Sequence, residues 1–346
     1  MIRIRYIFLV VTAAIAARCA MAAGPSMMPS ANTRYATDAY PGFDREENII
    51  VKGKKTPRWF SWINGPAKKT ASEQLAYAIE CEKAESWRAA RRGYDSLVRE
   101  WPASPEAPIA QEKLADLQLG HYADYEEAFE EYRYLMDYYS SQCNYSKIAE
   151  RLYEVALLME EEGAQFLFFR LPNTVDVRRA FEGVVLRSPG AKFVPAAMLK
   201  IAKLREDADE YDKAVTVYEN LRNLHPYTEE AEKSLVLEGA ARMKLLKDHG
   251  YNRTRVKDTV EFLKMALANN PSEETKKALS GWYEEAVLQL EEEAYKSAKF
   301  YDAKTSTRRG AIAAYENFLR EYPASRYAEV VSKRIAELKA AGDLKK

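Results

Sequence analysis

One phrase of residues recurs from about residue 71 to the end of the chain. Each copy has a small residue, an aromatic or apolar residue soon after it, and a stop that is usually proline. In the clearest copy Ala311 is followed four residues later by Tyr315, and the stop is Pro323. Residues four apart share one face of a helix, so the alanine allows close approach of a neighbouring helix and the tyrosine fills the next gap. The proline ends the helix because it cannot donate the next amide hydrogen bond.

Six copies of this phrase can be aligned. Their signature residues are Ala90, Tyr94, Pro102, Ala128, Tyr132, Ala214, Tyr218, Pro226, Ala311, Tyr315 and Pro323. The stops fall at residues 102, 140, 189, 226, 271 and 323, so they are 38, 49, 37, 45 and 52 residues apart. A repeat of this length holds two antiparallel helices. A single pair cannot bury its apolar face, but stacked pairs bury a continuous core.

The apolar periodicity between the stops therefore predicts an all-α protein built as an α-solenoid with a concave face. The predicted helix pairs are 71–84 and 87–100, 106–119 and 124–138, 145–162 and 176–187, 194–207 and 210–224, 228–247 and 254–268, and 272–300 and 308–321. A last helix at about 325–340 would cap the stack, followed by a polar tail at 341–346. Low Gly and Pro counts, 14 each in 346 residues, agree with a helical fold.

The charge balance and the motif content exclude several functions. Lys+Arg and Asp+Glu are 52 each, and this neutral balance gives no sign of a nucleic-acid partner. The three histidines lack metal-ligand spacing, and no Gly-rich phosphate loop or catalytic motif is present. We therefore expect no cofactor, no metal site and no enzymatic activity.

The first residues have the form of an export signal. Two arginines lie within residues 1–5, and residues 6–17 are uncharged and mostly apolar. That stretch is too short to span a bilayer, which needs about 20 apolar residues. Ala20-Met21-Ala22 fits the small-residue rule for cleavage before Ala23, which predicts a signal peptide over residues 1–22.

Cys19 leaves a second mode of processing open. Bacterial lipoproteins keep a cysteine as their first mature residue, and acyl chains then hold it in a membrane. Ala16 and Ala17 suit the small residues expected before such a cysteine, whereas Arg18 does not. Cleavage before Ala23 is therefore favoured, with attachment through partners, and lipid attachment at Cys19 is the alternative.

Residues 23–70 show no helical period and predict a flexible extension ahead of the solenoid at 71–340. Three aromatic residues, Trp59, Phe60 and Trp62, interrupt it. Such side chains are costly to leave in water. We expect them to dock, either on the body of the protein or on a partner.

The sequence resembles the BamD-like tetratricopeptide lipoproteins of outer-membrane protein assembly. The resemblance rests on Tyr322-Pro323-Ala324-Ser325-Arg326-Tyr327-Ala328, on Arg178-Arg179-Ala180-Phe181-Glu182 after the aromatic segment 166–170, and on Phe300-Tyr301. It covers roughly residues 71–340, with more repeat material than the five-repeat pattern of that family. It implies a periplasmic scaffold, at the inner face of the outer membrane, that binds a barrel-assembly component and outer-membrane protein precursors.

By analogy with that family, the N-terminal repeats would receive the peptide. Tyr77, Tyr122 and Tyr125 are the candidate contacts, because tyrosine rings contact peptides at low entropy cost. Core packing is an equally good explanation for each of them. A second kind of periplasmic tetratricopeptide adaptor, the Tol-Pal or cell-division coordinator, is the alternative function. That group often has a coiled coil before its repeats, and residues 23–70 show no heptads.

Overall fold

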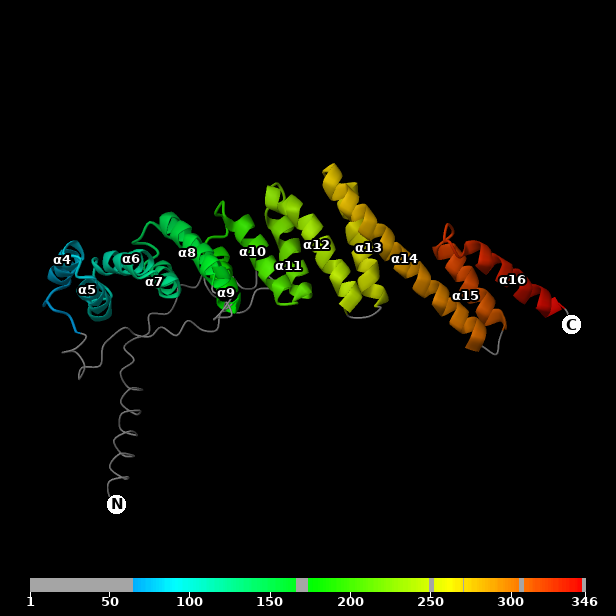
Figure 1. The fold of residues 1–346 in the computed structure, drawn as a ribbon, viewed down its shortest axis with the longest axis horizontal. Coiled ribbons are helices and arrows are strands. Elements are labelled where there is room, and N and C mark those ends of the chain that lie inside the picture. Colours follow the sequence, from blue (N-terminus) through cyan, green and yellow to red (C-terminus); the bar gives the residue numbers. More distant parts are fainter. Residues whose placement is uncertain (1–64, 166–173, 249–251, 270, 305–307, 344–346) are drawn as a thin grey trace, which may run out of the picture. The chain divides into compact units, whose positions relative to one another are not determined.

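The computed structural model describes residues 65–165, 174–248, 252–269, 271–304 and 308–343. Within these ranges the chain forms α-helices and one π-helix, and no strand is present (Figure 1). The predicted all-α solenoid of helix pairs is confirmed. None of the described helices is both long and apolar enough to cross a membrane. Cys19, Trp59, Phe60 and Trp62 lie outside the described residues.

The helices follow the predicted pairs closely. In chain order they are α4 (Ala71–Lys83), α5 (Trp87–Glu100), α6 (Ala107–Leu117), the π-helix η3 (Gln118–Tyr122), α7 (Tyr125–Tyr138), α8 (Tyr145–Gln165), α9 (Thr174–Arg187), α10 (Val194–Asp207), α11 (Tyr211–Leu224), α12 (Glu229–Asp248), α13 (Arg253–Ala268), α14 (Glu273–Lys304), α15 (Arg308–Glu321) and α16 (Ala328–Asp343). The last predicted helix, expected at about 325–340, is α16. The largest difference at a helix end is in α14, which continues to Lys304 beyond the predicted end at 300.

The chain divides into two compact units, one ending at Leu204 and the other beginning at Arg205. In the first unit each helix from α4 to α9 contacts the next helix in the chain, and in the second unit the same holds from α11 to α16. In the second unit α12 also contacts α14 directly. Contacts between successive helices are the arrangement of a solenoid. The division falls within α10, inside the range 71–340 that the sequence presents as one domain.

The signature alanines and tyrosines lie in the core. The side chains of Ala90, Ala128, Ala214 and Ala311 are buried, as are those of Tyr94, Tyr132, Tyr218 and Tyr315. Pro102, Pro226 and Pro323 each come two residues after the end of a helix, namely α5, α11 and α15. The repeated phrase thus supplies the contact between paired helices and then the end of the second helix.

Each signature tyrosine also donates its hydroxyl to a carboxylate near the end of the preceding helix. The pairs are Tyr94 with Glu82, Tyr132 with Asp116 (2.5 Å), Tyr218 with Glu206 (2.8 Å) and Tyr315 with Asp302 (3.2 Å). A buried ring with its hydroxyl bonded to a carboxylate ties the two helices of a pair together. The carboxylate lies 12, 16, 12 and 13 residues before the tyrosine. This variable spacing hides the pattern in the sequence.

In the first helix pair, α4 and α5 approach each other closely at a glycine. A Cβ built on Gly93 of α5 would lie 2.8 Å from the Cβ of Ala78 on α4 and 3.3 Å from its Cα. The buried amide of Gln74 donates to the Gly93 carbonyl and to the Ser96 hydroxyl, both at 3.0 Å. Gly93 therefore allows the two backbones to approach more closely than any larger residue would.

A buried ion pair connects the second and third helix pairs. The guanidinium of Arg187, at the end of α9, donates to both carboxylate oxygens of Asp137 on α7, at 2.8 and 2.9 Å. These side chains are only 2% and 3% exposed. The Tyr145 hydroxyl of α8 donates to the Arg187 carbonyl at 2.7 Å. Three helices of the first unit therefore meet at one bidentate pair.

Candidate protein-binding surfaces

A groove with a volume of about 570 Å³ lies between α12 and α14 in the second unit. These are the first helices of two successive pairs, and they contact each other directly. The groove is lined by Met243, Leu246 and Lys247 from α12, by Glu285, Leu288, Gln289 and Glu292 from α14, and by Arg326 from the turn before α16. It therefore combines three apolar side chains with polar and charged ones.

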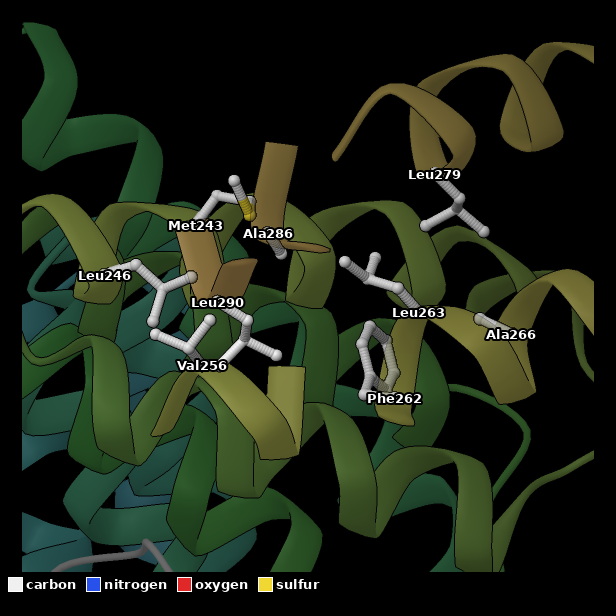
Figure 2. Packing of buried hydrophobic residues seen from close by; sticks show 9 residues of the cluster. All are labelled: Met243, Leu246, Val256, Phe262, Leu263, Ala266, Leu279, Ala286 and Leu290. Carbon is white, nitrogen blue, oxygen red and sulfur yellow. The ribbon is translucent and has the colours of Figure 1, made fainter. Parts of the chain in front are cut away.

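The apolar lining of the groove is continuous with the core below it. Met243 and Leu246 belong to one buried cluster with Ala286 and Leu290 of α14 (Figure 2). Leu288 differs from them because it is 44% exposed. The groove thus has a fixed apolar base and one apolar side chain free to contact a partner.

A glycine sets the distance between α12 and α14. A Cβ built on Gly239 of α12 would lie 2.9 Å from two ring atoms of Trp282 on α14. The absence of a side chain at Gly239 lets this indole pack against the α12 backbone. The two helices are therefore held together at Trp282, and the groove lies farther along both helices, where Leu288 and Glu292 line it.

Ion pairs between exposed side chains surround the groove. Lys247 Nζ lies 3.4 Å from Glu285 Oε1, which joins α12 to α14, and Arg326 Nη2 lies 3.4 Å from Glu292 Oε2. Exposed pairs of this kind contribute about 0–1 kcal/mol each. A partner with charged side chains can therefore replace them at little cost.

The turn that carries Arg326 is fixed by its neighbours. The Ser325 hydroxyl donates to Glu291 Oε2 of α14 at 2.8 Å. The Tyr327 ring stacks on Tyr295 of α14, with ring centroids 4.3 Å apart, and Arg326 lies over the Tyr327 ring at 4.8 Å. The segment Tyr322–Ala328, which carries the family resemblance, therefore positions one charged residue of the groove.

A buried carboxylate, that of Glu238, holds α11, α12 and α13 together. Glu238 accepts hydrogen bonds from Arg222 and from Arg242 Nε (2.6 Å), and both guanidinium groups lie over the Phe262 ring, at 5.4 and 4.8 Å. Burial raises the pKa of Glu238 above its usual value, and the two arginines oppose that shift. Because both of its oxygens accept hydrogen bonds from guanidinium groups, Glu238 serves as a structural anchor.

The three tyrosines suggested by the sequence lie in the first unit, where the structure places them on different elements. Tyr77 is half-buried on α4, with Lys68 Nζ 5.6 Å from its ring. Tyr122 ends η3 and is half-buried, with the Arg91 guanidinium 5.2 Å from its ring. Tyr125 is the half-buried first residue of α7. Sequence reasoning missed the lining of the groove, because Met243, Leu246 and Leu288 resemble ordinary members of apolar stripes.

The described residues hold no group of His, Cys, Asp and Glu side chains that could bind a metal ion. Cys81 and Cys143 are both half-buried free thiols. Burial raises the pKa of Cys143, which reduces its reactivity as a thiolate.

Residues 196–226 match the family model described as "Tetratricopeptide repeat". This range covers most of α10, all of α11 and the stop at Pro226. No curated protein matches the chain.

Several solved structures are similar to the chain at low identity. One is a tetratricopeptide repeat protein from Parabacteroides merdae, with 12% identity and a TM-score of 0.29, covering 78% of this chain and 98% of that one. A second is the C-terminal part of a repeat-containing protein from Cytophaga hutchinsonii, with 12% identity and a TM-score of 0.29, covering 77% and 88%. A third is MamA from Desulfovibrio magneticus, with 14% identity and a TM-score of 0.27, covering 59% and 96%.

The repeat assignment rests on the matched residues 196–226 and on the helix pairs described above. Repeats of this class generally mediate contacts between proteins. The chain therefore carries a tetratricopeptide repeat at residues 196–226, within an α-solenoid of helix pairs.

Proposed function

We propose that this chain is an exported scaffold that binds protein partners in the groove between α12 and α14, and that it acts in the assembly of outer-membrane β-barrel proteins. The observation that carries the binding role is the groove itself, with its buried apolar base and exposed ion pairs. A groove between two helices that has an apolar base suits an amphipathic helix or an extended peptide.

The role in barrel assembly is supported by the resemblance to BamD-like proteins. The segment Tyr322–Ala328 carries the clearest part of that resemblance, and it is also the turn that positions Arg326 beside the groove. The predicted signal peptide at residues 1–22 agrees with a periplasmic location. The proposed partners are a barrel-inserting protein and the precursors of outer-membrane proteins.

Crosslinking and affinity isolation test this role. The full-length gene, with a C-terminal tag, is expressed in its native host, treated with a short crosslinker and purified, and the captured proteins are identified by mass spectrometry. The proposal predicts a barrel-inserting protein or barrel precursors among them. Recovery of neither would count against the barrel-assembly role, and recovery of a Tol-Pal component would favour the alternative adaptor role.

A matched pair of variants connects this capture to the groove. Leu288→Asp places a charge on the 44% exposed side chain in the groove, and Met265→Asp places one on a 61% exposed side chain of α13 that does not line it. Because both side chains are already solvent-accessible, both variants should melt close to the wild-type temperature. We expect Leu288→Asp to reduce capture strongly and Met265→Asp to leave it unchanged. Equal capture by both variants would exclude the groove as the binding site.

The mature N-terminus tests export and the mode of attachment. We propose cleavage before Ala23, so that partners hold the protein at the membrane. Mass spectrometry of the protein from its native host should find Ala23 as the first residue. An acylated Cys19 would instead establish a lipid anchor, and an intact Met1 would remove the export proposal.

A further inference from the structure

Helix α5 in the first unit exposes an excess of positive charge. Arg88, Arg91 and Arg92 are all exposed, and within the described part of the chain none of them forms an ion pair with a carboxylate. Of the two acidic residues of this helix, Asp95 lies 2.8 Å from Arg99. Exposed arginines elsewhere in the same unit are paired, for example Arg151 with Glu154 and Arg179 with Asp176. The carboxylates of the described residues therefore leave the charge of these three arginines without an ion-pair partner.

Aromatic rings lie on one side of these arginines. Trp87, the first residue of α5, stacks on His121 of η3 with ring centroids 4.5 Å apart. His121 meets the edge of Tyr122 at 4.8 Å. The Tyr122 hydroxyl is shielded from solvent and has no hydrogen-bond partner among the described residues. Short π-helical segments such as η3 are rare and often mark functional sites.

Arg91 is held in a fixed orientation within this group. Its guanidinium lies over the Tyr122 ring at 5.2 Å. The Gln118 amide oxygen, in the orientation that its hydrogen bonds favour, accepts from Arg91 Nη2 at 3.1 Å and from Nε at 3.2 Å. An arginine ordered in this way loses less side-chain entropy when it binds a carboxylate.

The other side of the patch includes Tyr77 of α4. The pKa of Tyr77 is raised, chiefly by its hydrogen bond to Cys81, and the nearby positive charge of Arg92 opposes that shift. Lys68 Nζ lies over the same ring. The α5 patch thus consists of Tyr77, Trp87, Arg88, Arg91, Arg92 and Tyr122, and it includes two of the tyrosines singled out in the sequence.

We infer that the α5 patch binds an acidic peptide segment of a partner protein, one in which carboxylates lie close to an aromatic or aliphatic residue. Guanidinium groups bind carboxylates in bidentate geometry, and the adjacent rings of Trp87 and Tyr122 offer contact area to an apolar side chain. Arginine, tryptophan and tyrosine are also the residue types that dominate binding energy in interfaces. This inference concerns the first unit and does not depend on the groove between α12 and α14.

Peptide binding to the purified full-length mature chain tests the inference. Fluorescent glutamate-rich peptides with one tryptophan are compared, by anisotropy, with lysine-rich peptides of the same length and with the glutamate-rich peptide lacking tryptophan. We expect the acidic tryptophan peptide to bind best and its affinity to fall as salt rises, because salt screens the charges. Equal binding of the acidic and the lysine-rich peptides would overturn the inference.

Two double variants with the same change in charge locate the binding site. Arg88→Gln with Arg92→Gln removes two patch charges that form no ion pair, and Arg133→Gln with Arg151→Gln removes two paired arginines of the same unit. We expect the first variant to bind the acidic peptide roughly tenfold more weakly, since one good charged contact is worth about that much, and the second to bind like wild type. Equal weakening in both variants would show that the peptide binds by general charge attraction, and it would contradict a specific binding site on the α5 patch.

Two other polyanions provide the last comparison. Single-stranded DNA and vesicles of anionic lipid are tested with the same pair of double variants. Patch-dependent binding to either of them, without binding to the acidic peptide, would contradict the inference. Patch-dependent binding to the peptide alone would support it.

Discussion

The signature tyrosines have buried rings, and their hydroxyl groups form hydrogen bonds with carboxylates. Tyr315 is buried at its ring and donates its hydroxyl to Asp302 at 3.2 Å. Burial, with the neighbouring carboxylate, raises the pKa of Tyr315 to about 12 and that of Tyr218 well above its usual value. Because the folded state holds the neutral phenol more tightly than the unfolded chain does, this contribution to stability is present below about pH 10. It is lost as the pH rises through the folded-state pKa of about 12.

We predict that Tyr315→Phe lowers the free energy of unfolding at neutral pH. The variant should also lose less of that free energy than the wild type as the pH rises into the alkaline range. The lost hydrogen bond costs about 0.5–1.5 kcal/mol. Asp302 keeps its contacts with Arg334, at 2.8 and 3.3 Å, so no carboxylate is left without a partner. Urea unfolding between pH 7 and 12 measures both effects, and an equally steep alkaline loss in the variant would contradict this pKa assignment.

Alanine substitutions at two glycines, Gly93 and Gly281, should change the stability of the protein in opposite directions. In Gly93→Ala the new methyl group would lie 2.8 Å from the Ala78 Cβ and 3.3 Å from its Cα, which cannot move without shifting α4. We expect a loss of about 1–3 kcal/mol from overpacking. Gly281, within α14, has no atom within 4 Å of a built Cβ, so Gly281→Ala should gain up to about 1 kcal/mol. Thermal melts of the two variants compare them directly, and shifts of the same sign would contradict the packing described here.

At the scale of helices, the sequence allowed the pairs to be predicted but concealed the contacts between them. The ends of α5, α9 and α11 follow from helical periodicity and from the stops at residues 102, 189 and 226. The π-helix η3 (Gln118–Tyr122) was not predicted: the predicted helix ends at residue 119, and apolar periodicity does not distinguish a π-helical turn from the end of an α-helix. The tyrosine–carboxylate contacts were also concealed, since the spacing between partners changes from one pair to the next.

The site could be predicted less well than the fold, for a physical reason. The groove depends on side chains from α12, α14 and the turn at Arg326. Sequence periodicity describes the faces of one helix, whereas a groove depends on the distance between two helices. That distance is set here by the contact of Gly239 with Trp282, and nothing in the local sequence distinguishes this glycine from one that faces solvent.

The Arg187–Asp137 pair predicts strong coupling between α7 and α9. Both side chains are almost fully buried and bonded at two positions. Asp137→Asn leaves a buried guanidinium without its anion, which typically costs about 3–5 kcal/mol. The control is Glu154→Gln, whose exposed partner is Arg151, with an expected change of at most about 1 kcal/mol. Chemical unfolding measures both, and similar small changes would mean that the buried pair contributes little.

At the scale of the whole molecule, the binding features lie in separate parts of the chain. The second unit carries a groove with an apolar base, and the first unit carries the basic and aromatic α5 patch. We propose both as surfaces that recognise proteins, and they differ in the chemistry of the peptide segment that each would bind. Although the chain has zero net charge, three exposed arginines are gathered on α5, and such a local charge suits the recognition of a partner of opposite charge.

Site-specific photocrosslinking at residue 288 tests the central claim most directly. A photoreactive amino acid is placed at Leu288 in the groove and, as the control, at Met265 on α13, in the full-length protein expressed in its native host. Irradiation should produce discrete protein adducts at position 288, containing a barrel-inserting protein or barrel precursors, and few at position 265. Absence of protein adducts at position 288, or the same adducts at both positions, would contradict the account of this groove as a protein-binding site.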